Sequence, residues 1–148
     1  MNCEAVIEIH DKEIGISGGL PGIRSRNELE SAVAAPMNVA AYENGDICDL
    51  AATYLYHIAK DHGFVDGNKR TGYLTCLTFL DLNGIDLGKP PCLELATIAT
   101  AAGLIDKRAL TGLLRQLVVT AREDPDYYQA IHAIRPTPSS NPAVQPDA

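Results

Sequence analysis

One short segment concentrates the side chains that can do chemistry: His62-Gly-Phe-Val-Asp-Gly-Asn-Lys-Arg70. His62 offers an imidazole that can take the proton from an attacking hydroxyl. Asp66 is a hard oxygen ligand of the kind that Mg²⁺ uses together with substrate phosphates. Lys69 and Arg70 add two positive charges. A metal ligand, a charge clamp and a base together indicate phosphoryl or nucleotidyl transfer.

The same segment ends where an apolar helical pattern begins, and Gly67 and Asn68 open that pattern. The N-terminus of a helix exposes unpaired N–H groups and the positive end of the helix dipole, so it suits a bound phosphate. We therefore expect Gly67, Asn68, Lys69 and Arg70 to bind phosphate groups.

Each of these residues also has a structural interpretation when it is taken alone. A single His62 is more often a packing or surface residue, and a single Asp66 more often caps a helix. Lys69 and Arg70 alone would be solvated surface cations. Their occurrence together at this spacing favours a site over these separate roles.

Helical periodicity dominates the rest of the chain and predicts the elements that position this segment. The expected helices cover residues 5–14, 26–35, 46–60, 68–82, 91–102 and 107–120. Ser25 and Glu28 form a capping-box pattern before the second helix, which we expect to end before Pro36. Residues 85–87 carry the one weak strand signal, and residues 124–134 are either a short helix or part of a tail.

Composition limits the classes of function. The chain has 148 residues, 46% of them hydrophobic, and a net charge of -7, which suits one globular domain and disfavours binding to nucleic acid or anionic membranes. The four cysteines form no C-x-x-C pair, so a zinc site is not expected. No apolar stretch is long enough to span a bilayer, and no leader pattern opens the chain, so a cytoplasmic protein is expected.

The pattern His-x-Phe-x-Asp-Gly-Asn-Lys-Arg resembles the active-site motif of the Fic/Doc superfamily in its Doc (death-on-curing toxin) form. The stretch Gly19-Leu-Pro-Gly-Ile-Arg24 follows the Doc pattern too, and the likeness covers residues 5–119. The resemblance implies an all-α fold, a compact helical bundle of about six helices. We expect this Fic/Doc domain to span residues 1–122, and residues 123–148 to be a Pro-rich extension that is disordered from about residue 135.

The resemblance also implies roles for the motif residues. His62 would be the general base and Arg70 would stabilise phosphate charge, so both are catalytic candidates. Asp66 would hold Mg²⁺ against the phosphates of ATP. Gly67 and Asn68 would form the anion cradle.

Two lysines refine these expectations. Typical Fic enzymes have Gly where this chain has Lys69, and they transfer AMP; the Doc form with Lys transfers the γ-phosphate of ATP. Lys60, two positions before the motif, either assists phosphate binding or only favours the C-terminal end of its helix dipole. His10 and His132 are expected to be surface or packing residues.

By resemblance, the protein is the toxin of a type II toxin–antitoxin system, and a protein kinase whose expected target is elongation factor Tu. An AMP transferase and a catalytically silent binding module remain the alternatives. The chain shows no convincing copy of the Ser/Thr-x-x-x-Glu motif that silences many Fic proteins: Glu43 has Val39 four positions earlier. We therefore expect a separate, Phd-like antitoxin that binds in trans through an amphipathic segment.

Overall fold

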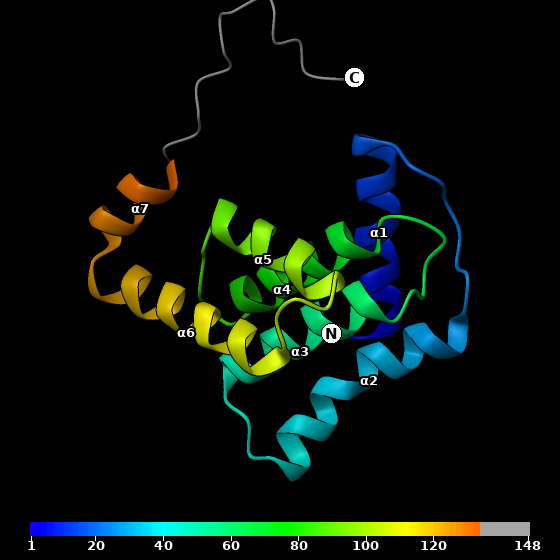
Figure 1. The fold of residues 1–148 in the computed structure, drawn as a ribbon, viewed down its shortest axis with the longest axis horizontal. Helices are drawn as coiled ribbons and strands as arrows, with labels where there is room; N and C mark the ends of the chain where they lie inside the picture. The colour runs from blue at the N-terminus through cyan, green and yellow to red at the C-terminus, as the bar shows by residue number, and fades with distance from the viewer. Residues whose placement is uncertain (134–148) are drawn as a thin grey trace, which may run out of the picture.

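The computed structural model describes residues 1–133, and within them the chain folds into seven α-helices without a strand (Figure 1). The helices are α1 (Cys3–Ser17), α2 (Arg26–Tyr42), α3 (Ile47–Lys60), α4 (Asn68–Leu82), α5 (Pro91–Ala101), α6 (Lys107–Glu123) and α7 (Pro125–Ala133). The all-α bundle expected from the sequence is thus confirmed, with one helix more than the six expected.

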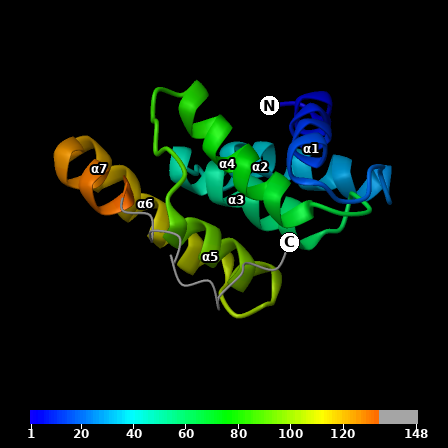
Figure 2. The ribbon, with the colours of Figure 1, turned by 90° about the horizontal axis from the view of Figure 1, so that it is seen from above.

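Helices α3 and α4 pack against each other at the centre of the bundle. Helices α1 and α2 lie on one side of this pair, and α5 and α6 lie on the other (Figures 1 and 2). The larger part of the core joins α3 and α4 to α5, α6 and α7. A second cluster of buried side chains lies beneath the α3–α4 loop: Val6, Leu29, Ala32, Val33, Tyr54, Ile58 and Phe64.

The two central helices begin and end where the sequence places them. Asp46 caps α3 by accepting hydrogen bonds from Cys48 N and Asp49 N, and the Asp49 carboxylate in turn accepts one from Asp46 N. At the end of α4, Gly84 adopts a left-handed φ of 83°, which allows the chain to turn. Between them lies the seven-residue loop 61–67, which carries most of the chemical motif.

The prediction that the second helix ends before Pro36 is wrong. Helix α2 continues through Pro36 to Tyr42, although the proline ring deprives the carbonyl of Ala32 of its usual donor. Pro36 itself is buried, on the same face as Leu29, Ala32, Val33 and Val39. Burial of this face against α3 offsets the helix bond that proline removes, a cost of about 3 kcal/mol.

The segment after α6 forms the short helix α7, which packs on the core through Tyr128. The side chain of Tyr128 in α7 is 2% exposed, and its hydroxyl donates a hydrogen bond to Leu87 O at 2.7 Å. Residues 85–87, which carried a weak strand signal, are irregular and bury Ile85 and Leu87. The domain boundary at residue 122 stays a prediction, and the disorder expected from residue 135 lies outside the described residues.

None of the helices within residues 1–133 combines the length and the apolar character needed to cross a membrane.

Candidate active site

The α3–α4 loop is held from within by two of its own residues. Phe64 is 1% exposed and anchors the loop in the core. The side-chain amide of Asn68 brackets Phe64: its Oδ1 accepts a hydrogen bond from Phe64 N, and its Nδ2 donates one to Phe64 O, both at 3.0 Å. The amide of Asn68 thus shapes the loop, and its backbone N–H is the group left for an anion at the start of α4.

The segment between α1 and α2 runs antiparallel to this loop and fastens it from outside. Arg24 N and Ser25 N both donate to Gly63 O, at 2.8 and 3.1 Å, and Val65 N donates to Gly22 O at 3.0 Å. At the same place, Ile23 and Phe64 form a single antiparallel β-bridge. These main-chain bonds satisfy polar backbone groups of the loop and join it to the α1–α2 segment.

His62 stands at the end of the loop nearest α3, and its side chain is exposed. Its backbone adopts a left-handed φ of 51°, which costs a residue with a Cβ about 1 kcal/mol. The guanidinium of Arg24 stabilises this backbone conformation, because its Nε donates a hydrogen bond to His62 O at 2.8 Å. The strained backbone directs the imidazole into the cavity described below.

Asp66 is held as a carboxylate by two backbone donors. Leu20 N donates to its Oδ2 at 3.0 Å, and Gly67 N donates to its Oδ1 at 2.8 Å. These two bonds are the main reason that the pKa of Asp66 lies below its usual range, and the nearby positive charge of Arg70 lowers the pKa further. Each oxygen keeps a lone pair that can bind a cation.

Lys69 and Arg70 extend from the first turn of α4. Lys69 is exposed, whereas Arg70 is half-buried; its Nη1 donates to Gly18 O at 2.9 Å and lies 4.0 Å from the carboxylate of Glu13. Gly19 passes between the two charged groups of the site. A Cβ at Gly19 would lie 2.8 Å from Asp66 Oδ2 and 2.9 Å from Arg70 Nη2.

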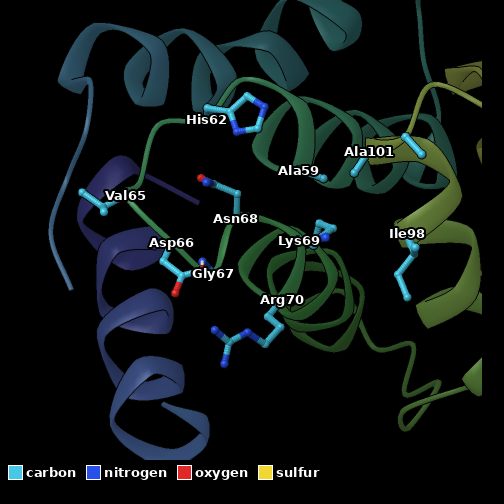
Figure 3. Close-up of a pocket in the computed structure, with 11 residues that line it drawn as sticks. Ala59, His62, Val65, Asp66, Gly67, Asn68, Lys69, Arg70, Ile98 and Ala101 are labelled. Atoms are coloured by element: carbon cyan, nitrogen blue, oxygen red, sulfur yellow. Dashed lines mark hydrogen bonds between the residues drawn. The ribbon is translucent and has the colours of Figure 1, made fainter. Parts of the chain in front are cut away.

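These groups surround a cavity of about 440 Å³ (Figure 3). The loop and the first turn of α4 supply its polar wall: His62, Asp66, Gly67, Asn68, Lys69 and Arg70. Ile98, Ala101 and Ala102 at the end of α5 supply the apolar wall opposite. A second hollow of about 310 Å³ also has Lys69, Arg70 and Ile98 in its wall, so the space continues past Lys69. Six of the seven residues proposed from the sequence thus gather around one cavity.

Helix α4 meets this cavity with its N-terminus, and no side chain within residues 1–133 caps it. The N-cap residue is Gly67, with a left-handed φ of 77°. An uncapped helix start has N–H groups that need an acceptor, and the helix dipole makes that end positive. The arrangement suits a phosphate group in the cavity.

Lys60 is the candidate that the structure does not bring to the cavity. Its Nζ donates to Thr100 O at 3.4 Å and lies 5.4 Å from the ring centre of Tyr56. The lysine therefore satisfies a carbonyl in the last turn of α5 and stacks on an aromatic ring. The assignment of Lys60 to phosphate binding does not agree with this geometry.

The sequence interpretation assigned no role in the site to His10, Arg24 or Gly19. The sequence predicted His10 to be a surface or packing residue, and it is buried. It packs against the α3–α4 loop, where its ring stacks on that of Phe64 with 3.8 Å between the ring centroids. One signal pointed to it, since Val6, His10 and Ile14 recur every four residues on one helix face. A polar side chain on such a face needs a hydrogen-bond partner when it is buried.

The donor set fits one Mg²⁺ ion that arrives with a nucleotide. Within residues 1–133, no three His, Cys, Asp or Glu side chains are grouped closely enough to hold a metal by themselves. Asp66 supplies one carboxylate, and Mg²⁺ commonly takes one or two carboxylates and completes its octahedral shell with phosphates and waters. Asp66 is therefore the residue that would hold the ion.

The chain is similar to members of one known family. Residues 1–80 match the model of the Fic/DOC family. Over 119 residues the chain is 35% identical to "Protein kinase doc" of Escherichia phage P1, an alignment that covers 80% of this chain and 94% of that protein. Over 74 residues it is 40% identical to "Toxin Doc" of Mycolicibacterium smegmatis, covering 47% of this chain and 55% of that protein.

Proposed function

Because the chain belongs to the Fic/Doc family, we propose that it is a toxin that acts as a protein phosphotransferase. It transfers the γ-phosphate of ATP to a hydroxyl group of a target protein. The names of the two relatives, a protein kinase and a toxin, support this function.

The observation that carries the proposal is the uncapped N-terminus of α4 inside the cavity, with Lys69 and Arg70 in the same turn. Three sources of positive potential converge there: the helix end and two cations. Phosphoryl transfer depends mainly on such charge stabilisation and on positioning. A cavity with a base at one end and this cationic turn at the other meets both needs.

In the proposed reaction, a ring nitrogen of His62 takes the proton of the target hydroxyl as that oxygen bonds to the γ-phosphorus. The bond from the γ-phosphorus to its bridging oxygen breaks, and ADP leaves. Arg70 stabilises the charge on the phosphate oxygens. Asp66 would hold Mg²⁺, which neutralises phosphate charge when it is bound.

Lys69 favours phosphate transfer over AMP transfer. A glycine at this position leaves space along the loop for the inner phosphates of a nucleotide, whereas the lysine side chain extends into the wall that the two hollows share. We infer that Lys69 favours an orientation of ATP in which the γ-phosphate faces His62.

A bacterial lysate incubated with the protein and ATP tests the function. We expect one protein to gain phosphate on a hydroxyl side chain, identified by mass spectrometry of its peptides. His62→Ala should leave the lysate unmodified, and His132→Ala, which alters a histidine in α7, should modify it normally. AMP on the target would support the alternative transferase, and no modification by the unaltered protein would contradict both.

We further propose that the target is elongation factor Tu, that its modification stops translation in the cytoplasm, and that a Phd-like antitoxin binds this chain in trans. The absence of a convincing inhibitory motif in the sequence supports a separate inhibitor. Co-expression with the neighbouring open reading frame tests the last point. We expect a complex and restored growth; a neighbour that neither binds nor restores growth would contradict it.

A further inference from the structure

His10 is a buried polar side chain that the proposed reaction does not use. It lies on α1, is 1% exposed, and belongs to an element remote in sequence from the motif. Its ring stacks on Phe64 with 3.8 Å between centroids and an interplanar angle of 4°. Complete burial of an imidazole is costly unless its nitrogens find partners.

The Nε2 atom of His10 contacts the main chain of Asp66, the candidate metal ligand. Nε2 lies 2.8 Å from Asp66 O, and a carbonyl oxygen only accepts, so Nε2 carries the proton and donates it. The other nitrogen, Nδ1, lies 3.2 Å from the carboxylate of Asp11 in the next position of α1. The imidazole is thus fixed by the stacking contact at its ring face and by the hydrogen bond that Nε2 donates.

This contact acts at the residue where the loop becomes a helix. Asp66 O belongs to the peptide unit whose N–H is that of Gly67, and this N–H donates to Asp66 Oδ1. One peptide plane therefore has its carbonyl held by His10 and its N–H held by the carboxylate. A Cβ on Gly67 would lie 3.6 Å from the His10 ring, so the imidazole also lies directly behind the helix start.

We propose that His10 is a positioning residue for the phosphate and magnesium site. By holding the Asp66–Gly67 peptide, it fixes both the direction of the Asp66 carboxylate and the first N–H groups of α4. The proposal rests on the proposed function for its catalytic consequence, but its structural content stands on the contacts above. The simpler alternative is that His10 only fills space under Phe64.

Two substitutions of equal length separate these alternatives. The amide nitrogen of Gln lies as many bonds from Cα as Nε2 of His, so His10→Gln keeps a donor for Asp66 O. His10→Met has a similar length and no donor. Both lose the aromatic ring, so the difference between them isolates the hydrogen bond. His10→Phe completes the series, because it keeps the stacking on Phe64 and removes the donor.

The first measurement is hydrogen exchange of the full chain, which needs no catalysis. We expect His10→Met and His10→Phe to speed exchange of the amides of Phe64, Val65 and Gly67, which donate hydrogen bonds that hold the loop, and His10→Gln to restore slow exchange. Tyr128→Phe is the control, since it also removes one donor to a main-chain carbonyl, at Leu87, on the far side of the core. It should leave exchange at residues 62–70 unchanged.

The second measurement is steady-state phosphate transfer. Loss of a group that orients a metal ligand costs roughly 10–100-fold in metal affinity or activity. We expect His10→Met and His10→Phe to raise the apparent KM for Mg²⁺ by this factor with the KM for the target protein unchanged, and His10→Gln to approach the unaltered protein.

Each result decides the point. Equal exchange in His10→Met and His10→Gln, or normal exchange in His10→Phe, would overturn the proposal and leave His10 as a packing residue. If the unaltered protein transfers no phosphate, the proposed function fails, and the exchange series alone still decides the role of His10. If His10→Phe does not fold, the Met and Gln pair carries the comparison.

Discussion

The imidazole of His62 is directed into the cavity by main-chain contacts. Arg24 Nε holds its carbonyl, and the carbonyl of Gly63 accepts from two consecutive N–H groups. The strained, left-handed backbone of His62 is thus stabilised from the α1–α2 segment. Because the His62 side chain is exposed, its removal should change the stability of the fold little.

We therefore predict that His62→Ala lowers the rate of phosphate transfer by about 10²–10⁴-fold, because a general base is lost. The midpoint of thermal unfolding should change little, because the imidazole is exposed. Initial rates with purified target, together with melting curves, measure both. A variant that keeps most of its rate would remove His62 from the reaction.

Asp66 gives a prediction about pH. Its pKa is lowered in the folded chain from the ordinary value of 3.8, so the ionised carboxylate stabilises the fold. This contribution is complete above the pKa of the unfolded state and is lost as the pH falls through the lower, folded pKa. Asp66→Asn should therefore unfold more easily than the unaltered chain at about pH 6, and the difference should shrink below about pH 4. Urea unfolding at several pH values measures it, and a difference independent of pH would contradict it.

At the scale of elements, two short segments far apart in the sequence form the site together. The α1–α2 segment supplies Gly18 O to Arg70 and Leu20 N to Asp66, so it touches both charged groups. The motif and its helix α4 could be predicted because their residue types and periodicity are local features. The pairing of the two segments could not, since main-chain hydrogen bonds leave no mark on side-chain pattern.

Gly19 tests this pairing. Its φ of 121° strains any residue with a Cβ, and an added Cβ would force the side-chain ends of Asp66 and Arg70 to shift. Gly19→Ala should lower phosphate transfer strongly, because both charged groups must move. Gly84→Ala is the matched control: it has a φ of 83° and nothing within 4 Å of the added Cβ. Both variants should lose about 1–3 kcal/mol of stability from backbone strain, and equal rates in the two would contradict the prediction.

Helix α2 shows that a local sequence signal can also give a wrong prediction. Proline is a strong local signal for a helix end, yet the buried face around Pro36 carries the helix for six further residues. Packing against α3 decides the outcome, and that packing depends on the whole bundle.

At the scale of the molecule, positive charge at the cavity is more focused than the sequence indicated. Residues 60–70 contain three cations and two acids in a chain of net charge -7. The structure directs Lys60 to α5, so Lys69, Arg70 and the start of α4 supply the positive potential of the cavity. Side-chain direction of a long lysine at a helix end depends on its neighbours, which is why residue type alone left both roles of Lys60 open.

The packing of α7 gives a prediction for the whole chain. A chain that ends at residue 122 lacks Tyr128, whose ring is buried and whose hydroxyl bonds to Leu87 O. It should lose about 3–5 kcal/mol of stability, the usual cost of removing a buried aromatic side chain. Below its unfolding temperature it should transfer phosphate at a normal rate, because α7 is remote from the cavity. Equal stability of the short and full chains would show that α7 adds nothing to the core.

The proposed chemistry requires that the γ-phosphate moves from this cavity to the target, with His62 as the base. ATP that carries distinguishable labels at the α- and γ-phosphates tests it in one reaction with the purified target. We predict γ-label without α-label on the target, and neither label with His62→Ala. Alpha-label on the target, or γ-label that persists with His62→Ala, would contradict the proposed chemistry.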